Sequence, residues 1–168
     1  MPGDLEKIII GLPREAYGSN YETHLLEQYK LYVQMADKIS ERRQTANTYF
    51  LTINTALVAL LGIVWPATEK LVDVLWYVIA GLAGMILCYS WYRLLRSYKD
   101  LNSGKFRVVG VIEKYLPLRP YDAEWESLGR GKNSKLYLPF THIEAKIPWV
   151  FFALYLGVIA ISIYCRIC

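Results

Sequence analysis

Cysteine and histidine, which form disulfides and most zinc sites, are scarce in this chain, because the sequence has only three cysteines and two histidines. Cys88 lies within a long apolar stretch, and Cys165 and Cys168 form a Cys-x-x-Cys pair near the C-terminal end. A zinc or thioredoxin-type site would need a second ligand pair or a strand-to-helix context, and the pair has neither. His24 and His142 could meet in the fold, but a metal site would also need a third ligand. We therefore expect no metal and no cofactor, and the role of the Cys-x-x-Cys pair stays open.

The sequence also lacks a recognisable catalytic constellation. The spacing of its residues supports neither a Ser-His-Asp nor a Cys-His arrangement. Residues 129–132 contain glycines and a lysine, but the upstream glycine of a phosphate-binding loop is missing. Asn133 stands where that loop would have Ser or Thr. The sequence therefore predicts a protein that is not an enzyme.

Charge is absent from three long stretches, although 20% of all residues are charged. Residues 48–65, 74–92 and 147–165 contain no Asp, Glu, Lys or Arg. Each stretch is about as long as a helix that crosses the hydrocarbon core of a bilayer, which takes roughly 20 apolar residues. A soluble domain of 168 residues could not bury three such helices. The predicted fold class is therefore an all-α integral membrane protein with three transmembrane helices, assembled into a homo-oligomeric bundle.

Helix-breaking residues are almost absent from the first of these helices and from the segment before it. Gly62 is the only Gly or Pro between Ser19 and Pro66, so a cytoplasmic helix over 19–47 should run directly into the span at 48–65. Apolar or small residues recur along it at spacings of three and four, broken only by Arg43. Such a near-heptad stripe favours self-assembly through this helix. The stripe comprises Leu25, Tyr29, Tyr32, Ala36, Ile39, Arg43, Ala46, Phe50, Ile53, Leu57, Leu60 and Val64.

A polar arc lies opposite this stripe on the first span. Its six amide and hydroxyl side chains cover about 160° of a helical wheel. Polar groups in a membrane helix need partners within the protein, so the arc predicts either an oligomer interface or the lining of an aqueous lumen. Beyond Thr55 the helix is wholly apolar, which favours an interface over a continuous pore. The arc consists of Gln44, Asn47, Thr48, Thr52, Asn54 and Thr55.

Small residues at four-residue spacing predict close helix packing in the other two spans. They are Ala80, Gly84 and Cys88 in the second span, and Ala153 and Gly157 in the third. We expect the second helix to continue to about Asn102, with a short helix over 106–116 and a helical turn over 121–128. The whole chain is predicted to be one membrane domain. Its parts are an N-terminal arm at 1–18, expected to be mobile or loosely docked, the helix at 19–47, the spans at 48–65, 74–92 and 147–165, and a cytoplasmic loop region at 93–146.

Lys and Arg are distributed unevenly across the predicted membrane. Residues 1–47 and 93–146 hold 17 of them, whereas the hairpin after the first span and the C-terminal tail hold two. The positive-inside rule therefore places the N-terminus and the long loop in the cytoplasm and the C-terminus outside. Basic residues beside a bilayer favour contact with anionic lipid headgroups rather than with nucleic acid. The candidates are Arg93, Arg119, Arg130, Lys132 and Lys135.

Several segments are similar to the RipA family of small octameric bacterial inner-membrane proteins. The similarity covers nearly the whole chain from about residue 20. It is carried by YETHLLEQYK (21–30), RRQTAN (42–47), LTINTAL (51–57), LNSGKF (101–106), LPLRPYDAEWE (116–126), LGRGK (128–132) and LPFTHIE (138–144). The resemblance implies a homo-octamer in the bacterial cytoplasmic membrane and no known catalytic residues.

Together these observations predict a non-enzymatic membrane protein that assembles with itself. We expect a scaffold or regulatory role, with the cytoplasmic helices and loop as a platform for an unidentified cytoplasmic protein. The alternative is a gated ion channel or a membrane-permeabilising effector lined by the polar arc. Transport by a proton relay is disfavoured, because no carboxylate, His or Lys lies within the three spans.

Overall fold

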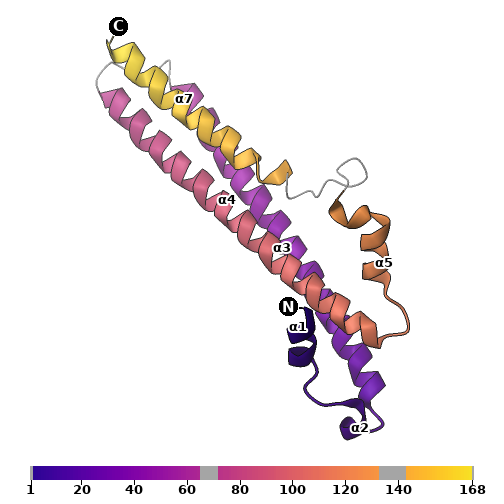
Figure 1. Cartoon of the computed structure of the whole chain (residues 1–168). Helices are drawn as coiled ribbons and strands as arrows, with labels where there is room; N and C mark the ends of the chain where they lie inside the picture. The colour runs from indigo at the N-terminus through magenta and orange to yellow at the C-terminus, as the bar shows by residue number, and fades with distance from the viewer. Residues whose placement is uncertain (1, 65–71, 133–142, 168) are drawn as a thin grey trace. The chain divides into compact units, whose positions relative to one another are not determined.

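The structure is a computed structural model that describes residues 2–64, 72–132 and 143–167. In these ranges the chain is helical, and no strand is present. Figure 1 shows the helices in chain order by colour. They are α1 (Pro2–Ile9), α2 (Arg14–Tyr17), α3 (Tyr21–Val64), α4 (Val72–Ile112), η2 (Glu113–Tyr115), α5 (Pro120–Ser127), η3 (Gly129–Gly131) and α7 (Ile147–Ile167).

Three of these helices are long and apolar enough to cross a membrane. The qualifying segments are Tyr21–Ile63, Val74–Tyr115 and Ile147–Cys165. They contain the second and third predicted spans in full and the first as far as Ile63, and Trp65 lies outside the described residues. The predicted all-α membrane fold is therefore confirmed. Pro148 lies at the second position of α7, in the first turn, where the missing N–H of proline breaks no helical hydrogen bond.

Helix α3 is a single helix of 44 residues. It begins at Tyr21, and the first carbonyl to accept a helical hydrogen bond here is that of Asn20. Ala36 on the predicted stripe is buried, and most of the other stripe residues are half-buried. The stripe therefore packs largely against other helices of its own chain.

Helix α4 is longer than predicted. The sequence indicated an end near Asn102 and a separate helix over 106–116, but α4 continues unbroken to Ile112 and passes into the 3-10 turn η2. Asn102, Ser103 and Gly104 are poor helix formers, which is why a break was expected there. Burial of Val109 and Val111 on the next two turns offsets that weak propensity.

The chain divides into two compact units, and α3 and α4 each contribute a segment to both. The membrane unit comprises residues 43–97 and 140–168. The other unit comprises residues 1–42 and 98–139, and we call it the cytoplasmic unit after the location that the sequence predicts for it. In the membrane unit the fully buried side chains include Trp91, Leu95 and Tyr155. In the cytoplasmic unit they include Val109 and Glu113.

The N-terminal arm, expected to be mobile or loosely docked, contains two short helices and contacts the cytoplasmic unit. Lys114 Nζ donates to Glu6 Oε2 over 2.7 Å, and Tyr115 Oη donates to Glu6 Oε1 over 2.6 Å. Arg14 forms an ion pair with Glu22 of α3. The arm is thus held in part by polar side-chain contacts.

Candidate functional site

The centre of the membrane unit is the side chain of Asn54 on α3, which is 0% exposed. Its Oδ1 accepts hydrogen bonds from Tyr155 Oη on α7, at 3.1 Å, and from Cys88 Sγ on α4, at 3.4 Å. Its Nδ2 donates to the carbonyl oxygen of Phe50 at 2.8 Å. One amide from the predicted polar arc therefore joins all three membrane helices of a single chain.

Asn47 lies at one side of the same arc, and its hydrogen-bond partner is an indole. Trp91 Nε1 on α4 donates to Asn47 Oδ1 over 3.0 Å. The Trp91 ring stacks on Phe50 with centroids 5.9 Å apart and planes 7° apart. It also contacts Phe151 of α7 at 6.1 Å. A buried indole finds both an acceptor for its N–H and aromatic neighbours here, as such a ring requires.

Helix α7 lies close to α4 because two glycines leave room for it. A β-carbon added at Gly84 would come within 3.0 Å of the Tyr155 ring, and one added at Gly81 would come within 3.0 Å of Ile159. Of the small residues predicted to pack on α4, Gly84 and Cys88 are buried and Ala80 is half-buried. On α7, Ala153 is exposed and a β-carbon at Gly157 would meet nothing within 4 Å. The small residues of α7 therefore lie outside its contact with α4.

The other four residues of the polar arc point away from the protomer's own helices. Gln44, Thr48, Thr52 and Thr55 are all exposed. At 100° per residue they fall within about 80° of one another, next to the sector that holds Asn47 and Asn54. Their predicted role as an oligomer interface or a lumen lining stays a prediction, and they are the part of the arc that another molecule could reach.

An ion pair lies where α3 changes from charged to apolar sequence. Arg43 Nη1 and Glu144 Oε2 are 3.3 Å apart, and their side chains are only 21% and 14% exposed. Arg43 is the residue that interrupts the apolar stripe, so the ion pair explains how a cation is accommodated there. Glu144 lies three residues before α7, and the pair therefore links the start of α7 to α3.

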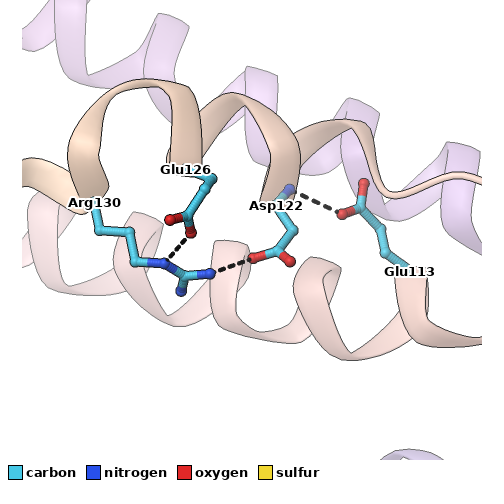
Figure 2. A network of polar contacts seen from close by, with 4 residues as sticks. All are labelled: Glu113, Asp122, Glu126 and Arg130. Carbon is cyan, nitrogen blue, oxygen red and sulfur yellow. Dashed lines mark hydrogen bonds and ion pairs between the residues drawn. The ribbon is translucent and has the colours of Figure 1, made fainter.

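In the cytoplasmic unit a buried carboxylate holds α5 in place. Glu113 is 0% exposed and accepts three hydrogen bonds. Tyr29 Oη on α3 donates over 2.9 Å, and the backbone N–H groups of Tyr121 and Asp122 donate over 3.1 and 3.2 Å. Figure 2 shows the Glu113 carboxylate directed at the backbone of Asp122 in the first turn of α5. A carboxylate at this end of a helix satisfies N–H groups that have no partner within the helix and is favoured by the helix dipole.

The predicted headgroup residues have different surroundings. Arg130 lies between Glu126 and Asp122 and forms ion pairs with both (Figure 2). The hydrogen bond to Glu126 and the nearby carboxylates raise the pKa of Arg130. Its backbone is left-handed, with φ 52°, between two glycines that also have positive φ. Arg93, Arg119 and Lys132 are exposed, and Lys135 lies outside the described residues.

The histidines and cysteines considered as ligands do not form a cluster in the described structure. His24 Nδ1 lies 2.8 Å from Tyr17 Oη, which is an exposed side-chain contact. Within residues 2–64, 72–132 and 143–167, no group of three or more His, Cys, Asp or Glu residues is arranged to hold a metal ion. Cys165 is exposed, whereas His142 and Cys168 lie outside the described residues.

Three residues that organise these sites were not singled out from the sequence. Trp91, Tyr155 and Glu113 each bury a polar group in an apolar segment. The sequence contains a feature that points to them, because a hydroxyl, an indole N–H or a carboxylate in such a segment needs a hydrogen-bond partner. What the sequence does not reveal is which residue on another helix supplies that partner.

The profile of the Octameric membrane protein family (8xMP) matches residues 26–164. The chain belongs to this family. The match runs from the first turns of α3 through the last turns of α7, so it includes the Asn54 and Glu113 contacts. No match was found among curated proteins or among solved structures. Membership agrees with the resemblance identified from the sequence segments.

Proposed function

We propose that this protein is a non-enzymatic scaffold or regulator that assembles as a homo-oligomer in the bacterial cytoplasmic membrane. The observation that carries the proposal is the exposed polar face of α3, formed by Gln44, Thr48, Thr52 and Thr55. When such an apolar helix presents four polar side chains to lipid, those side chains lose their hydrogen bonds with water. Contact with a second copy of the chain restores those bonds.

The number of copies comes from the family and not from the geometry. Membership of the octameric family supports an assembly of eight protomers. The polar face offers hydroxyl and amide groups that fix the register of neighbouring helices, which is how polar residues act in membrane bundles. On α7, Ala153 is exposed and a β-carbon at Gly157 would meet nothing within 4 Å, so these small residues add a second surface that allows close approach of another helix.

The proposed orientation has the N-terminus and the cytoplasmic unit inside and the C-terminus outside. It rests on the 17 Lys and Arg residues in the segments assigned to the cytoplasm, against two in the others. In this orientation the α5 segment, held by Glu113, faces the cytoplasm as a platform for a protein partner. Exposed cations such as Arg119 and Lys132 are available for anionic headgroups or for that partner.

The assembly is tested by light scattering of the purified protein in a mild detergent. Eight chains of 19.4 kDa correspond to about 155 kDa of protein. Thr52→Trp places a large ring on the polar face and is expected to reduce this mass. Ile86→Trp is the matched control, since Ile86 is 67% exposed on α4 and lies opposite that helix's buried face. A monomeric wild type, or an unchanged mass for Thr52→Trp, would overturn the proposal.

A gated channel or permeabilising effector is the second candidate, and the same polar face favours it. If the four exposed side chains face an oligomer axis rather than a neighbouring helix, they line an aqueous path. Planar-bilayer recording distinguishes the two functions. The channel requires a conductance that Thr52→Leu alters, whereas the scaffold predicts none. Asn54→Leu is a poor probe of the lumen, because Asn54 is fully buried within the protomer.

A further inference from the structure

We infer that the membrane unit carries a binding site for an anionic phospholipid between α4 and α7, with Arg96 and Lys146 as its headgroup ligands. The site deepens the proposed function, since it rests on these helix ends lying in the cytoplasmic leaflet. It is distinct from the polar face of α3. Arg96 and Lys146 were not among the residues expected to contact headgroups from the sequence.

The level of the site is fixed by an aromatic pair. Tyr92 of α4 and Trp149 of α7 meet edge to face, with ring centroids 5.4 Å apart. Trp149 also contacts Phe152, at 5.6 Å. Tyr and Trp concentrate where lipid meets water, because each ring has an apolar body and a polar edge. Trp149 is 49% exposed, so its ring is open to the surroundings beside α4.

Both cations lie about one helical turn beyond this pair, toward the charged end of the unit. Arg96 follows Tyr92 by four residues, which is about 6 Å along α4, and is about 40° from it around the helix. It therefore shares the flank of α4 that contacts α7. Lys146 lies directly before the antiparallel α7, and its carbonyl oxygen accepts a hydrogen bond from the Trp149 N–H at 3.1 Å. A single headgroup level thus receives one cation from α4 and one from the residue that precedes α7.

No described residue neutralises these two cations. Glu144 is the one carboxylate among the described side chains of the membrane unit, and it is paired with Arg43 at 3.3 Å. Arg96 and Lys146 are exposed, and neither has an ion-pair partner in the part of the chain that the structure describes. The positive charges of Arg96 and Lys146 are therefore available to a phosphate group from outside the protein.

The surface next to the cations, on the membrane side, suits acyl chains. Tyr89 and Leu82 on α4, and Leu156 on α7, are each about half exposed. On the helical wheels they lie on or next to the flanks that carry the Tyr92–Trp149 contact. A phospholipid with its phosphate at Arg96 and Lys146 would place its chains along these side chains. A soluble anion would use only the cations and would leave the apolar surface bare.

The test is native mass spectrometry of the full-length protein with palmitoyl-oleoyl phosphatidylglycerol, compared with palmitoyl-oleoyl phosphatidylcholine. The wild type is expected to retain the anionic lipid preferentially. Arg96→Gln/Lys146→Gln should lower its affinity by about five-fold per cation, or about thirty-fold for the pair. Lys30→Gln/Lys38→Gln removes the same charge from exposed positions in the cytoplasmic unit and should leave retention unchanged.

Equal retention of both lipids by the wild type, or unchanged retention by the Arg96→Gln/Lys146→Gln variant, would overturn the site. Equal losses in the two double variants would also overturn it, because the effect would then be one of net charge. The same spectra report the number of copies per complex. A protein that retains the lipid as a monomer would contradict the proposed assembly and leave the lipid site standing, so the two failures are distinguishable.

Discussion

Gly84 is the residue at which the Tyr155 ring lies directly against the backbone of α4. Its Gly84→Ala variant places a methyl group closer than 3.0 Å to that ring, so α7 must shift or the ring must rotate. We expect a loss of about 1 to 3 kcal/mol in stability. Gly104→Ala is the control, since a β-carbon there meets nothing within 4 Å and alanine favours the helix.

The measurement for these two variants is helix content by circular dichroism during titration with sodium dodecyl sulfate. Gly84→Ala should unfold at a lower detergent fraction than the wild type, and Gly104→Ala at an equal or higher one. A Gly84→Ala variant that unfolds at the same detergent fraction as the wild type, or at a higher one, would show that Gly84 is not a contact point for α7.

Glu6 makes the docking of α1 sensitive to pH. Hydrogen bonds from Lys114 and Tyr115 lower the pKa of the Glu6 carboxyl. A carboxyl whose pKa is lower in the folded state stabilises that state above its unfolded pKa, and this contribution is lost as the pH falls through the folded pKa. Docking of α1 should therefore be complete at neutral pH and weaken under acidic conditions.

An NMR titration of the Glu6 side chain checks this prediction. Its midpoint should lie below that of an ordinary glutamate, which is about 4.3. Lys114→Gln should raise the midpoint, whereas Lys7→Gln, which removes a charge beside Glu6 in sequence, should change it little. Similar effects of the two variants would show that long-range charge, rather than the hydrogen bonds, sets the pKa.

At the residue scale the sequence identified polar groups better than it identified their partners. Asn47 and Asn54 were singled out because amides in a span need acceptors and donors. The structure supplies them from Trp91, Cys88 and Tyr155, which lie on other helices. Partners so distant in sequence depend on how helices pack, and spacing along one helix carries no information about that.

At the scale of the element, α5 depends on one carboxylate that belongs to another segment. Glu113→Ala removes the acceptor for Tyr29 and for two N–H groups in the first turn of α5. The loss of acceptor bonds at buried donors costs about 1 to 3 kcal/mol. We therefore expect faster amide hydrogen exchange over residues 120–128, measured by mass spectrometry.

Glu124→Ala is the matched control for this experiment, because Glu124 is an exposed acid on α5 itself. It should leave the exchange rate of the other α5 amides close to that of the wild type. Exchange that rises equally in both variants would show that α5 is held by its overall charge and not by the Glu113 hydrogen bonds. Unchanged exchange in Glu113→Ala would contradict the prediction directly.

The three spans and the long first helix could be predicted at this scale, because charge-free stretches and missing helix breakers are local properties. The length of α4 could not. Asn102, Ser103 and Gly104 indicated a break by their intrinsic propensity, and the burial that outweighs it involves Val109 and Val111 on later turns. The α1 helix was missed for the same reason, since its docking to Lys114 joins residues 108 apart in sequence.

At the scale of the whole molecule, the orientation proposed from the Lys and Arg distribution can be tested with a membrane-impermeant maleimide. In a Cys168→Ser background, the exposed Cys165 should react in intact spheroplasts, whereas the buried Cys88 should not. In a Cys165→Ser/Cys168→Ser background, an added Ser127→Cys on α5 should react only after the membrane is opened. The reverse pattern would invert the topology.

The Asn54 contacts also have a consequence for synthesis. Cys88 follows Asn54 by 34 residues, whereas Tyr155 follows it by 101. At ribosomal rates of about 5 to 20 residues per second, the tyrosine emerges roughly 5 to 20 s after the amide that it will bind. During that interval α3 and α4 can pair in the membrane, with only the thiol of Cys88 available to the amide from α4. Of the three membrane helices, α7 is made last and completes the hydrogen bonding of Asn54 on α3. A chain that stalls before α7 would leave the Asn54 amide without the hydrogen bond from Tyr155.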